Sequence, residues 1–263
     1  MDVKSITPLI ITYDEAPNIA RTLDKLVWAH RIVVIDSGSV DGTLSILQRY
    51  PAVEVFHRTF DDFAAQLNFG LTKVKTEWVL ALDADYQISD ELIDELETLA
   101  PADRISGYNA EFIYRIFGRA LRGTLYPAHI VLYRRLRGSY RNEGHAYRLT
   151  LEGETGLLSG KIFHDDRKSL LRWLASQQRY AGIEADYLLS KTNTDLRKSD
   201  RVRLMAWPAP FLVFLHTLLI KGCVFEGWPG WLYVLQRTLA EIMIAIVLID
   251  RRLRARNQKD RNF

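Results

Sequence analysis

The sequence predicts an α/β protein with a mostly parallel sheet, an antiparallel extension and C-terminal amphipathic helices. Three observations lead to this fold class. Apolar runs alternate with helical patterns over residues 1–100, strand-like alternation fills 107–164, and two long apolar stretches occupy 207–249. Strands buried on both faces of a parallel sheet read as continuous apolar runs, and the first hundred residues have that pattern.

The first hundred residues hold four expected strands, each followed by an expected helix. The strands are expected at 5–13, 31–36, 53–56 and 78–82. The helices are expected at about 18–28, 41–49, 62–74 and 90–99, with Asn18 or Asp14 capping the first and Ser89 the last. Ligands of such sheets bind at the carboxyl ends of the strands, so the polar residues after each strand are the candidates for function.

The remaining chain continues with a helix at 168–190 and a polar, basic hinge at 191–204. The composition, with 48% hydrophobic and 25% charged residues among 263, is globular and excludes a disordered chain. A net charge of +3 gives no reason to expect nucleic acid as a partner. Residues 197–263 nevertheless carry 12 Lys or Arg against 5 Asp or Glu, which suggests an anionic surface as partner.

The single cysteine and the N-terminus both suggest the cytoplasm. Cys223 has no second cysteine with which to form an internal disulfide, which suits a reducing compartment. The N-terminal residues show no long apolar run behind a basic start, so no secretory signal is expected.

Two acidic residues, Asp83 and Asp85, follow the strand at 78–82 directly. Carboxylates two residues apart can reach one hard divalent cation where the backbone turns, and Mg²⁺ or Mn²⁺ prefers such oxygens. A cation held there would neutralise the charge of a departing diphosphate. The alternative is a solvated turn with a helix cap, which the position between a buried strand and a helix disfavours.

Polar residues also follow the first two strands. Asp36 ends the strand at 31–36, beside small residues that let a flat ligand approach the backbone, and its carboxylate can accept from a base or a ribose hydroxyl. Asp41 is expected to act mainly as a helix cap. The stretch Thr12-Tyr13-Asp14-Glu15 follows the first strand and should face the same edge of the sheet as Asp36 and Asp85.

These three clusters together resemble the motifs of glycosyltransferase family 2, the inverting nucleotide-sugar transferases with a GT-A fold. The resemblance covers about residues 5–100. It rests on Thr12-Tyr13-Asp14-Glu15, on the stretch from Ile35 to Thr43, and on the stretch from Trp78 to Asp85. Asp14 stands where the family usually has Asn.

The resemblance implies a Rossmann-like GT-A domain at 1–190, with a nucleotide-sugar-binding half at 1–100 and an acceptor half at 101–190. A basic, amphipathic, membrane-associating region follows at 191–263. The implied nucleotide-sugar-binding residues are Thr12, Tyr13, Glu15, Asp36, Ser37, Gln66, Asp83 and Asp85. The implied cofactor is Mg²⁺ or Mn²⁺, with Asp83, Asp85 and His164 as metal ligands.

The rest of the chain resembles, more loosely, the lipopolysaccharide core β-glucosyltransferases and related envelope-glycan transferases. The features are Tyr126-Pro127, a helix with Gln178 and Tyr180-Ala181 after His164, and the stretch from Lys221 to Gly230. Those enzymes carry V-H-E where this chain has Gly144-His145-Ala146, so the family's glutamate is missing here.

Inverting transfer needs a base that takes the proton of the acceptor hydroxyl. Glu143 is the predicted base, with Asp165 and Asp166 as the other candidates. His145 is predicted to orient the acceptor. A purely structural role as hydrogen-bonding residues is the alternative for both His145 and His164.

The C-terminal apolar segments predict association with a membrane surface. The segment 211–220 is too short to span hydrocarbon, and Gln236, Arg237 and Glu241 interrupt the segment 231–249. Helices lying in the interface, or packed together in a homo-oligomer, are therefore favoured over a full span. The end of the chain, 250–261, adds six basic and two acidic residues that favour an anionic leaflet.

The sequence thus predicts a metal-dependent, inverting glycosyltransferase on the cytoplasmic face of the membrane. It would transfer a sugar from a nucleotide diphosphate donor, expected to be UDP-linked, to a lipid-linked or envelope-glycan acceptor such as lipopolysaccharide core. One alternative is a polyprenyl-phosphate glycosyltransferase, whose phosphate acceptor needs no strong base. The non-enzymatic alternative is a catalytically degenerate membrane scaffold of the same fold.

Overall fold

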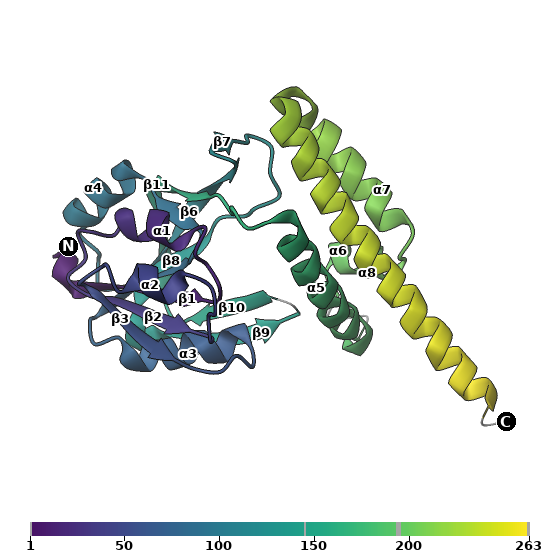
Figure 1. Cartoon of the computed structure of the whole chain (residues 1–263), viewed down its shortest axis with the longest axis horizontal. Helices are drawn as coiled ribbons and strands as arrows, with labels where there is room; N and C mark the ends of the chain where they lie inside the picture. The colour runs from purple at the N-terminus through teal and green to yellow at the C-terminus, as the bar shows by residue number, and fades with distance from the viewer. Residues whose placement is uncertain (1, 145, 193–195, 262–263) are drawn as a thin grey trace. The chain divides into compact units, whose positions relative to one another are not determined.

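The structure, a computed structural model, describes residues 2–144, 146–192 and 196–261 (Figure 1). The chain divides into two compact units. The sheet unit comprises Met1–Ala120, Tyr126–Asn142 and Ala146–Lys168. The helical unit comprises Leu121–Leu125, Glu143–His145 and Ser169–Phe263. The division after Lys168 precedes the boundary that the sequence suggests at residue 190.

A nine-stranded sheet forms the centre of the sheet unit in the described residues. Its order is β3-β2-β1-β4-β8-β6-β11-β5, with β7 paired to β6, and β9 and β10 form a separate two-stranded sheet. The strands are β1 (Ile6–Thr12), β2 (Ile32–Asp36), β3 (Val53–His57), β4 (Trp78–Asp83), β5 (Tyr86–Ile88), β6 (Ile105–Ile116), β7 (Arg119–Ala120), β8 (His129–Arg134), β9 (Gly138–Glu143), β10 (Ala146–Leu151) and β11 (Glu154–His164).

The first four strands of this order pair in parallel, and β8 joins them antiparallel to both β4 and β6. Beyond β8, β11 runs parallel to β6 and antiparallel to β5. The predicted fold class, a mostly parallel sheet with an antiparallel extension, is therefore confirmed.

Helices cover both faces of the sheet because alternate strand residues point to opposite sides. Ile6 and Ile10 of β1 join the cluster under α1, α2 and α4, whereas Leu9 joins the cluster under α3 (Figure 1). The bounds are α1 (Ile19–Asp24), α2 (Thr43–Leu47), α3 (Phe63–Lys73) and α4 (Asp90–Thr98), with short 3-10 turns η1 (Val3–Ser5) and η2 (Arg135–Arg137). Each face is thus sealed by its own apolar cluster.

Several predicted element ends match the structure in detail. The Ser89 side chain accepts from Leu92 N at 3.2 Å and caps α4, as predicted. Asn18 precedes α1 but makes no side-chain cap bond to it.

The sequence missed β5, whose three residues pair with β11, a strand far along the chain. It also described 191–204 as a hinge, although α6 (Lys198–Leu204) forms there.

The helical unit contains α5 (Leu170–Ser190), α6, α7 (Pro208–Leu215), the π-helical turn η3 (His216–Ile220), the 3-10 turn η4 (Cys223–Glu226) and α8 (Gly227–Arg261). Ala185 and Leu188 of α5 pack with Ile244 and Leu248 of α8 in one buried cluster. This packing explains why α5 belongs to the helical unit. Cys223 is fully buried, and its thiol donates to Gly123 O at 2.8 Å.

One helix of the described chain, Cys223–Gln258, is long and apolar enough to cross a membrane by length and composition alone. The core helix of a soluble protein can be equally long and apolar, so these properties do not distinguish a membrane-spanning helix from a core helix.

Two glycines give a matched test of this packing. An added Cβ at Gly160 in β11 would lie 2.4 Å from Leu92 Cα in α4, whereas one at Gly182 in α5 would meet nothing within 4 Å. Gly160→Ala should therefore destabilise the protein by about 2 kcal/mol or more, because the helix must move away from the strand. Gly182→Ala should stabilise it by roughly 0.5–1 kcal/mol, since alanine loses less backbone entropy in a helix.

Urea denaturation of the two variants and the parent measures both effects. Equal stability of Gly160→Ala and the parent would contradict the close approach of α4 to β11.

Candidate active site

The carboxyl ends of β2, β1 and β4 lie side by side in the sheet. Thr12 at the end of β1 is in register with Asp36 at the end of β2. Ile11 is in register with Asp83 at the end of β4. The three predicted clusters therefore meet at one edge of the sheet, as the alternation of strands and helices predicts.

A tight turn after β2 holds the Asp36 carboxylate in place. Asp36 is 1% exposed, and its Oδ2 accepts from Gly38 N at 2.8 Å and Ser39 N at 3.0 Å. Its Oδ1 accepts from the Ser39 hydroxyl at 2.5 Å. His57 Nδ1 lies 3.7 Å from Oδ2. These bonds fix the direction in which the carboxylate can meet a ligand.

The loop after β1 is tied to this turn. Asp14 has a left-handed backbone with φ of 53°, and its Oδ1 accepts from Val40 N at 2.7 Å. Asp41 Oδ1 accepts from Thr43 N at 2.9 Å, but Gly42 and not Asp41 occupies the N-cap position of α2. Aspartate tolerates the left-handed region better than most residues, so this position suits Asp as well as Asn.

Three further residues predicted to bind the nucleotide, Gln66, Thr12 and Tyr13, lie in or next to the loops after β1 and β2. Gln66 is fully buried, and its Nε2 donates to Ser37 Oγ and to Arg58 O, both at 2.8 Å. Gln66 therefore supports the loop that carries Ser37. Thr12 Oγ1 is buried and has no hydrogen-bond partner in the described chain. Tyr13 is 47% exposed.

Asp83 is bound by a tyrosine hydroxyl. Tyr147 OH donates to Asp83 Oδ1 at 3.1 Å. Burial and the neighbouring charge of Asp85 raise the pKa of Asp83 above its ordinary value. A carboxylate in this setting is readily neutralised by a proton or a cation.

Asp85 faces two cations. His164 Nε2 lies 3.3 Å from Asp85 Oδ2, and Lys168 Nζ lies 3.9 Å from the same oxygen. Burial favours the neutral acid, but the charges of His164 and Lys168 outweigh it and hold the pKa of Asp85 below its ordinary value. The same pairing raises the pKa of His164 against the effect of burial. Asp85 is therefore ionised in the folded protein.

Lys168 also forms ion pairs with two further acidic residues of the site, Glu15 and Asp166. Its Nζ lies 2.7 Å from Glu15 Oε1 and 3.4 Å from Asp166 Oδ1. Asn18 Nδ2 donates to Glu15 Oε2 at 2.8 Å and to Asp166 Oδ1 at 2.9 Å. Burial and the Asp85 charge raise the pKa of Glu15 to about 7. Glu15 thus changes protonation near neutral pH.

Asp165 is held by two guanidinium groups. Arg21 lies 3.2 Å and Arg167 lies 2.6 Å from its Oδ2, which also accepts from Gly118 N at 3.1 Å. Its side chain is 3% exposed. This environment suits a carboxylate that fixes the segment after β11 better than one that accepts a proton from a substrate. Asp166, bound by Asn18 and Lys168, is nearer to the other acids.

The favoured base, Glu143, belongs to the helical unit, whereas the acidic cluster belongs to the sheet unit. Its carboxylate forms an ion pair with Arg197. His145 lies outside the described residues. The roles predicted for Glu143 and His145 therefore stay predictions.

The residues at Asp83 and Asp85 fit a hard divalent cation. The two carboxylates supply oxygens of the kind that Mg²⁺ and Mn²⁺ prefer, and a metal at Asp85 Oδ2 would have to displace His164 or Lys168, which lie 3.3 Å and 3.9 Å from that oxygen. In the part of the chain that the structure describes, no group of three or more His, Cys, Asp or Glu side chains is arranged to hold a metal. Two carboxylates, completed by oxygens of a ligand, are the set that remains.

Comparison with known proteins assigns this arrangement to a family. The family model of glycosyl transferase family 2 matches residues 8–160, which include the carboxyl ends of β1, β2 and β4 but stop before His164 and Lys168. The chain belongs to this family. The match confirms the resemblance seen in the sequence, places the chain among the glycosyltransferases, and agrees with the predicted GT-A fold class.

Individual relatives are distant. The lipopolysaccharide core biosynthesis glycosyltransferase LpsC of Rhizobium meliloti (strain 1021) is 25% identical over 265 residues, 97% of this chain and 96% of that protein. An uncharacterized glycosyltransferase of Rickettsia bellii (strain RML369-C) is 26% identical over 72% of this chain, which spans only 64% of that protein. The structure of S. aureus TarS 1-349 in complex with UDP-GlcNAc gives a TM-score of 0.48 and 13% identity, over 94% of this chain and 91% of that one.

Sequence reasoning missed three residues of this candidate site. Lys168 pairs with acids from two distant loops, Asn18 bridges two of those acids, and Tyr147 reaches Asp83 from β10. Lys168 closes the stretch His164-Asp165-Asp166-Arg167-Lys168, in which the sequence directed attention to the acids. A lysine two residues after the paired acids Asp165 and Asp166 was the available signal.

Removing the Lys168 charge should destabilise the protein strongly. Lys168→Met leaves buried Glu15 and Asp85 without their cation, and we expect a loss of about 3 kcal/mol at pH 8. The loss should shrink as the pH falls through about 7, because Glu15 then takes up a proton and no longer needs the cation. Urea denaturation of parent and variant at pH 6 and pH 8 measures this.

The matched control is Lys161→Met, which removes a half-exposed lysine paired with Glu111. It should cost less than about 1 kcal/mol at either pH. Equal losses for the two variants would contradict a buried charge cluster.

Proposed function

We propose that this protein is an inverting glycosyltransferase that moves a sugar from a nucleotide diphosphate donor, UDP-linked, to a lipid-linked or envelope-glycan acceptor such as lipopolysaccharide core. The main support is that Asp36 ends β2 and Asp83 ends β4, the two strands that flank β1, with Asp85 two residues after Asp83. Family membership gives the reaction class, and these side chains give the place where the donor would bind.

The donor's nucleoside would lie over the ends of β1 and β2. Asp36 is fixed by its turn and can accept from a base N–H or a ribose hydroxyl. Thr12 Oγ1, buried without a partner in the described chain, is a donor and acceptor that a nucleoside would satisfy. Polar groups held this rigidly give selectivity with little loss of entropy on binding.

Asp83 and Asp85 would hold Mg²⁺ or Mn²⁺, and the donor's diphosphate would bind beside them. A divalent metal bound there supplies charge neutralisation for the departing nucleoside diphosphate. Lys168 holds Asp85 and Glu15 in position for this task. His164, surrounded by the rings of Tyr86, Tyr114 and Tyr126 at 4.7–5.3 Å between centroids, has a fixed orientation towards Asp85.

The acceptor class rests on the relative LpsC, whose name refers to lipopolysaccharide core biosynthesis and which aligns over nearly the whole chain. A hydroxyl acceptor needs a base, and Glu143 would have to exchange its ion pair with Arg197 before it could accept a proton. This ion pair favours, as a second candidate, a polyprenyl-phosphate acceptor, because a phosphate oxygen attacks without a strong base. Comparing transfer to polyprenyl phosphate with transfer to glycan acceptors separates the two.

The helical unit would bind the cytoplasmic face of the membrane. Exposed apolar residues recur every three or four positions along one face of α8, while the opposite face packs inside the unit. They are Trp228, Trp231, Leu235, Leu239, Ile242, Ile246, Ile249 and Leu253. One apolar outer face and a basic C-terminal end suit a helix that lies in the interface better than one that spans it.

Donor binding is tested by thermal unfolding with UDP and Mn²⁺. The parent's midpoint should rise by roughly 5 °C at ligand concentrations far above the dissociation constant. Asp85→Asn should lose most of this rise, because the metal and diphosphate lose a ligand. Asp103→Asn, which changes an exposed carboxylate, is the control and should keep it. An undiminished rise in Asp85→Asn would refute the placement of the diphosphate.

Membrane binding is tested with the double variant Leu235→Glu/Ile246→Glu, which places charges on the exposed apolar face of α8. Its binding to anionic vesicles should fall at least about tenfold, because two apolar side chains no longer enter the interface. Ala255→Glu/Gln258→Glu adds the same charge on the side of α8 away from this face and should bind much better. Co-sedimentation with anionic vesicles measures the binding of both variants. If both lose the same amount of binding, the added negative charge explains the loss and the apolar face of α8 does not contribute.

Analytical ultracentrifugation of the same variants without vesicles tests the alternative occupant of this face, a second copy of the chain. A dimer that only the Leu235→Glu/Ile246→Glu variant disrupts would contradict the membrane assignment.

A further inference from the structure

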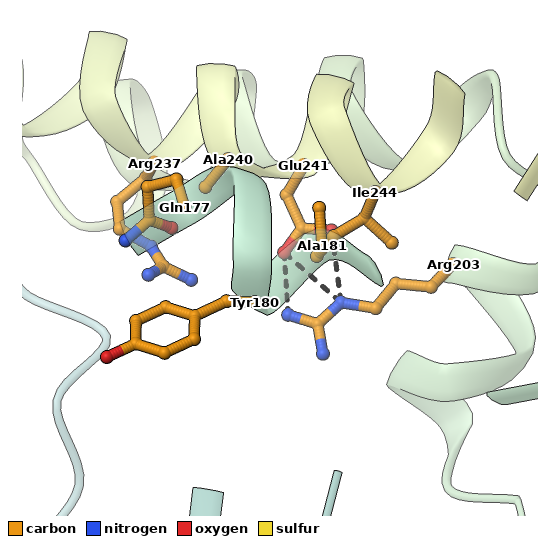
Figure 2. A pocket seen from close by; sticks show the side chains of 8 residues that line it. All are labelled: Gln177, Tyr180, Ala181, Arg203, Arg237, Ala240, Glu241 and Ile244. Atoms are coloured by element: carbon orange, nitrogen blue, oxygen red, sulfur yellow. Dashed lines mark hydrogen bonds and ion pairs between the residues drawn. The ribbon is translucent and has the colours of Figure 1, made fainter. Parts of the chain in front are cut away.

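A polar pocket lies within the helical unit, between α5, α6 and α8 (Figure 2). Its lining residues are Gln177, Tyr180, Ala181, Arg203, Arg237, Ala240, Glu241 and Ile244. The Tyr180-Ala181 pair belongs to the stretch that the sequence analysis singled out, and the transfer reaction gives it no role. The pocket belongs to the helical unit, whereas the proposed donor site belongs to the sheet unit.

Most of the charge in this pocket is internally paired. Arg203 bonds both oxygens of Glu241, at 2.6 Å from NH2 to Oε1 and 3.0 Å from Nε to Oε2 (Figure 2). Its NH1 bonds Glu184 Oε1 at 3.2 Å. The Glu241 side chain is 2% exposed and that of Glu184 is 7% exposed. Arg203 thus lies between two buried carboxylates and has few donors left for a ligand.

Arg237 is the second arginine of the pocket, and it does not take part in the ion pairs of Arg203. Glu241 lies one turn further along α8, but Arg203 occupies its oxygens. Arg237 Nε is buried, and no described side chain or backbone oxygen accepts a hydrogen bond from it. In Figure 2 its guanidinium group points towards the Gln177 and Tyr180 side chains. A buried donor without an acceptor costs free energy that an incoming anion would recover.

We propose that this pocket binds a phosphate group, with Arg237 as its main ligand. A planar guanidinium binds two phosphate oxygens at once, and the amide of Gln177 and the hydroxyl of Tyr180 offer further polar contacts. Phosphate suits the site better than an apolar ligand because the pocket presents a cation and polar groups. It suits the site better than a cation because Arg203 already pairs the carboxylates.

The phosphate can come from a lipid headgroup or from a soluble phosphate. Arg237 lies on the inner side of α8 with Glu241 and Ile244, opposite the exposed Leu235, Leu239 and Ile242, so a lipid headgroup would have to reach around the helix, whereas a soluble phosphate would not. The experiment below separates the two sources and requires no sugar transfer, so its outcome is independent of the proposed donor and acceptor.

The test uses the full chain and three probes. Vesicles carry either phosphatidic acid or phosphatidylserine at the same surface charge, and inorganic phosphate is titrated in a separate calorimetric arm. The parent should bind phosphatidic acid vesicles several-fold more tightly than phosphatidylserine vesicles. Arg237→Gln should reduce that preference to none, a loss of about tenfold in phosphatidic acid binding for one charge-assisted side chain.

Two further variants guard against a folding defect or a general charge effect. Arg254→Gln removes an exposed arginine from the same helix and should keep the preference. Ala240→Leu fills the pocket without changing its charge and should abolish the preference while vesicle binding through the apolar face remains. Circular dichroism confirms that each variant retains its helices.

The outcomes decide the proposal and the source of the phosphate. Arg237-dependent preference for phosphatidic acid supports a lipid headgroup, and Arg237-dependent binding of inorganic phosphate alone supports a soluble phosphate. If neither probe depends on Arg237, or if Arg254→Gln and Arg237→Gln behave alike, the proposal is wrong.

Discussion

The sheet unit depends on the balance between buried acids and the few cations that face them. Glu15, Asp85 and Asp166 come together around Lys168, and His164 supports Asp85 from the other side. Carboxylates this close repel one another in a medium of low polarity, so the loops that carry them stay together only with positive charge between them. Under the proposed function, a divalent cation and a diphosphate would add charges to this region that nearly cancel.

The positions of the strands that end at this edge were largely predictable from the sequence, because parallel strands covered on both faces must be apolar throughout. Ile32–Asp36 and Trp78–Asp83 are such runs, and each ends at the acidic residue that the sequence marks. The short strand β5 escaped prediction, since its three residues are defined by pairing with β11 and not by a local pattern. Helix α6 escaped because it is polar and packs through Arg203, whose partners lie on α5 and α8.

The same distinction applies to the site. Thr12, Asp36, Asp83 and Asp85 could be found because position after a strand is a local property of the sequence. Lys168 could not, because its contact with Glu15 joins residues 153 positions apart. The choice among Glu143, Asp165 and Asp166 as base likewise depends on three-dimensional surroundings. The two guanidinium groups on Asp165 distinguish it from Asp166, although the two acids are neighbours in the sequence.

The buried thiol of Cys223 has a practical consequence. It is enclosed in the helical unit, bonded to Gly123 O, and burial raises its pKa. An alkylating reagent can therefore reach the thiolate only when this part of the helical unit opens. The sequence contains no other cysteine. The rate of alkylation therefore measures how often this part of the helical unit opens, and unfolding of the sheet unit does not contribute a second reactive thiol.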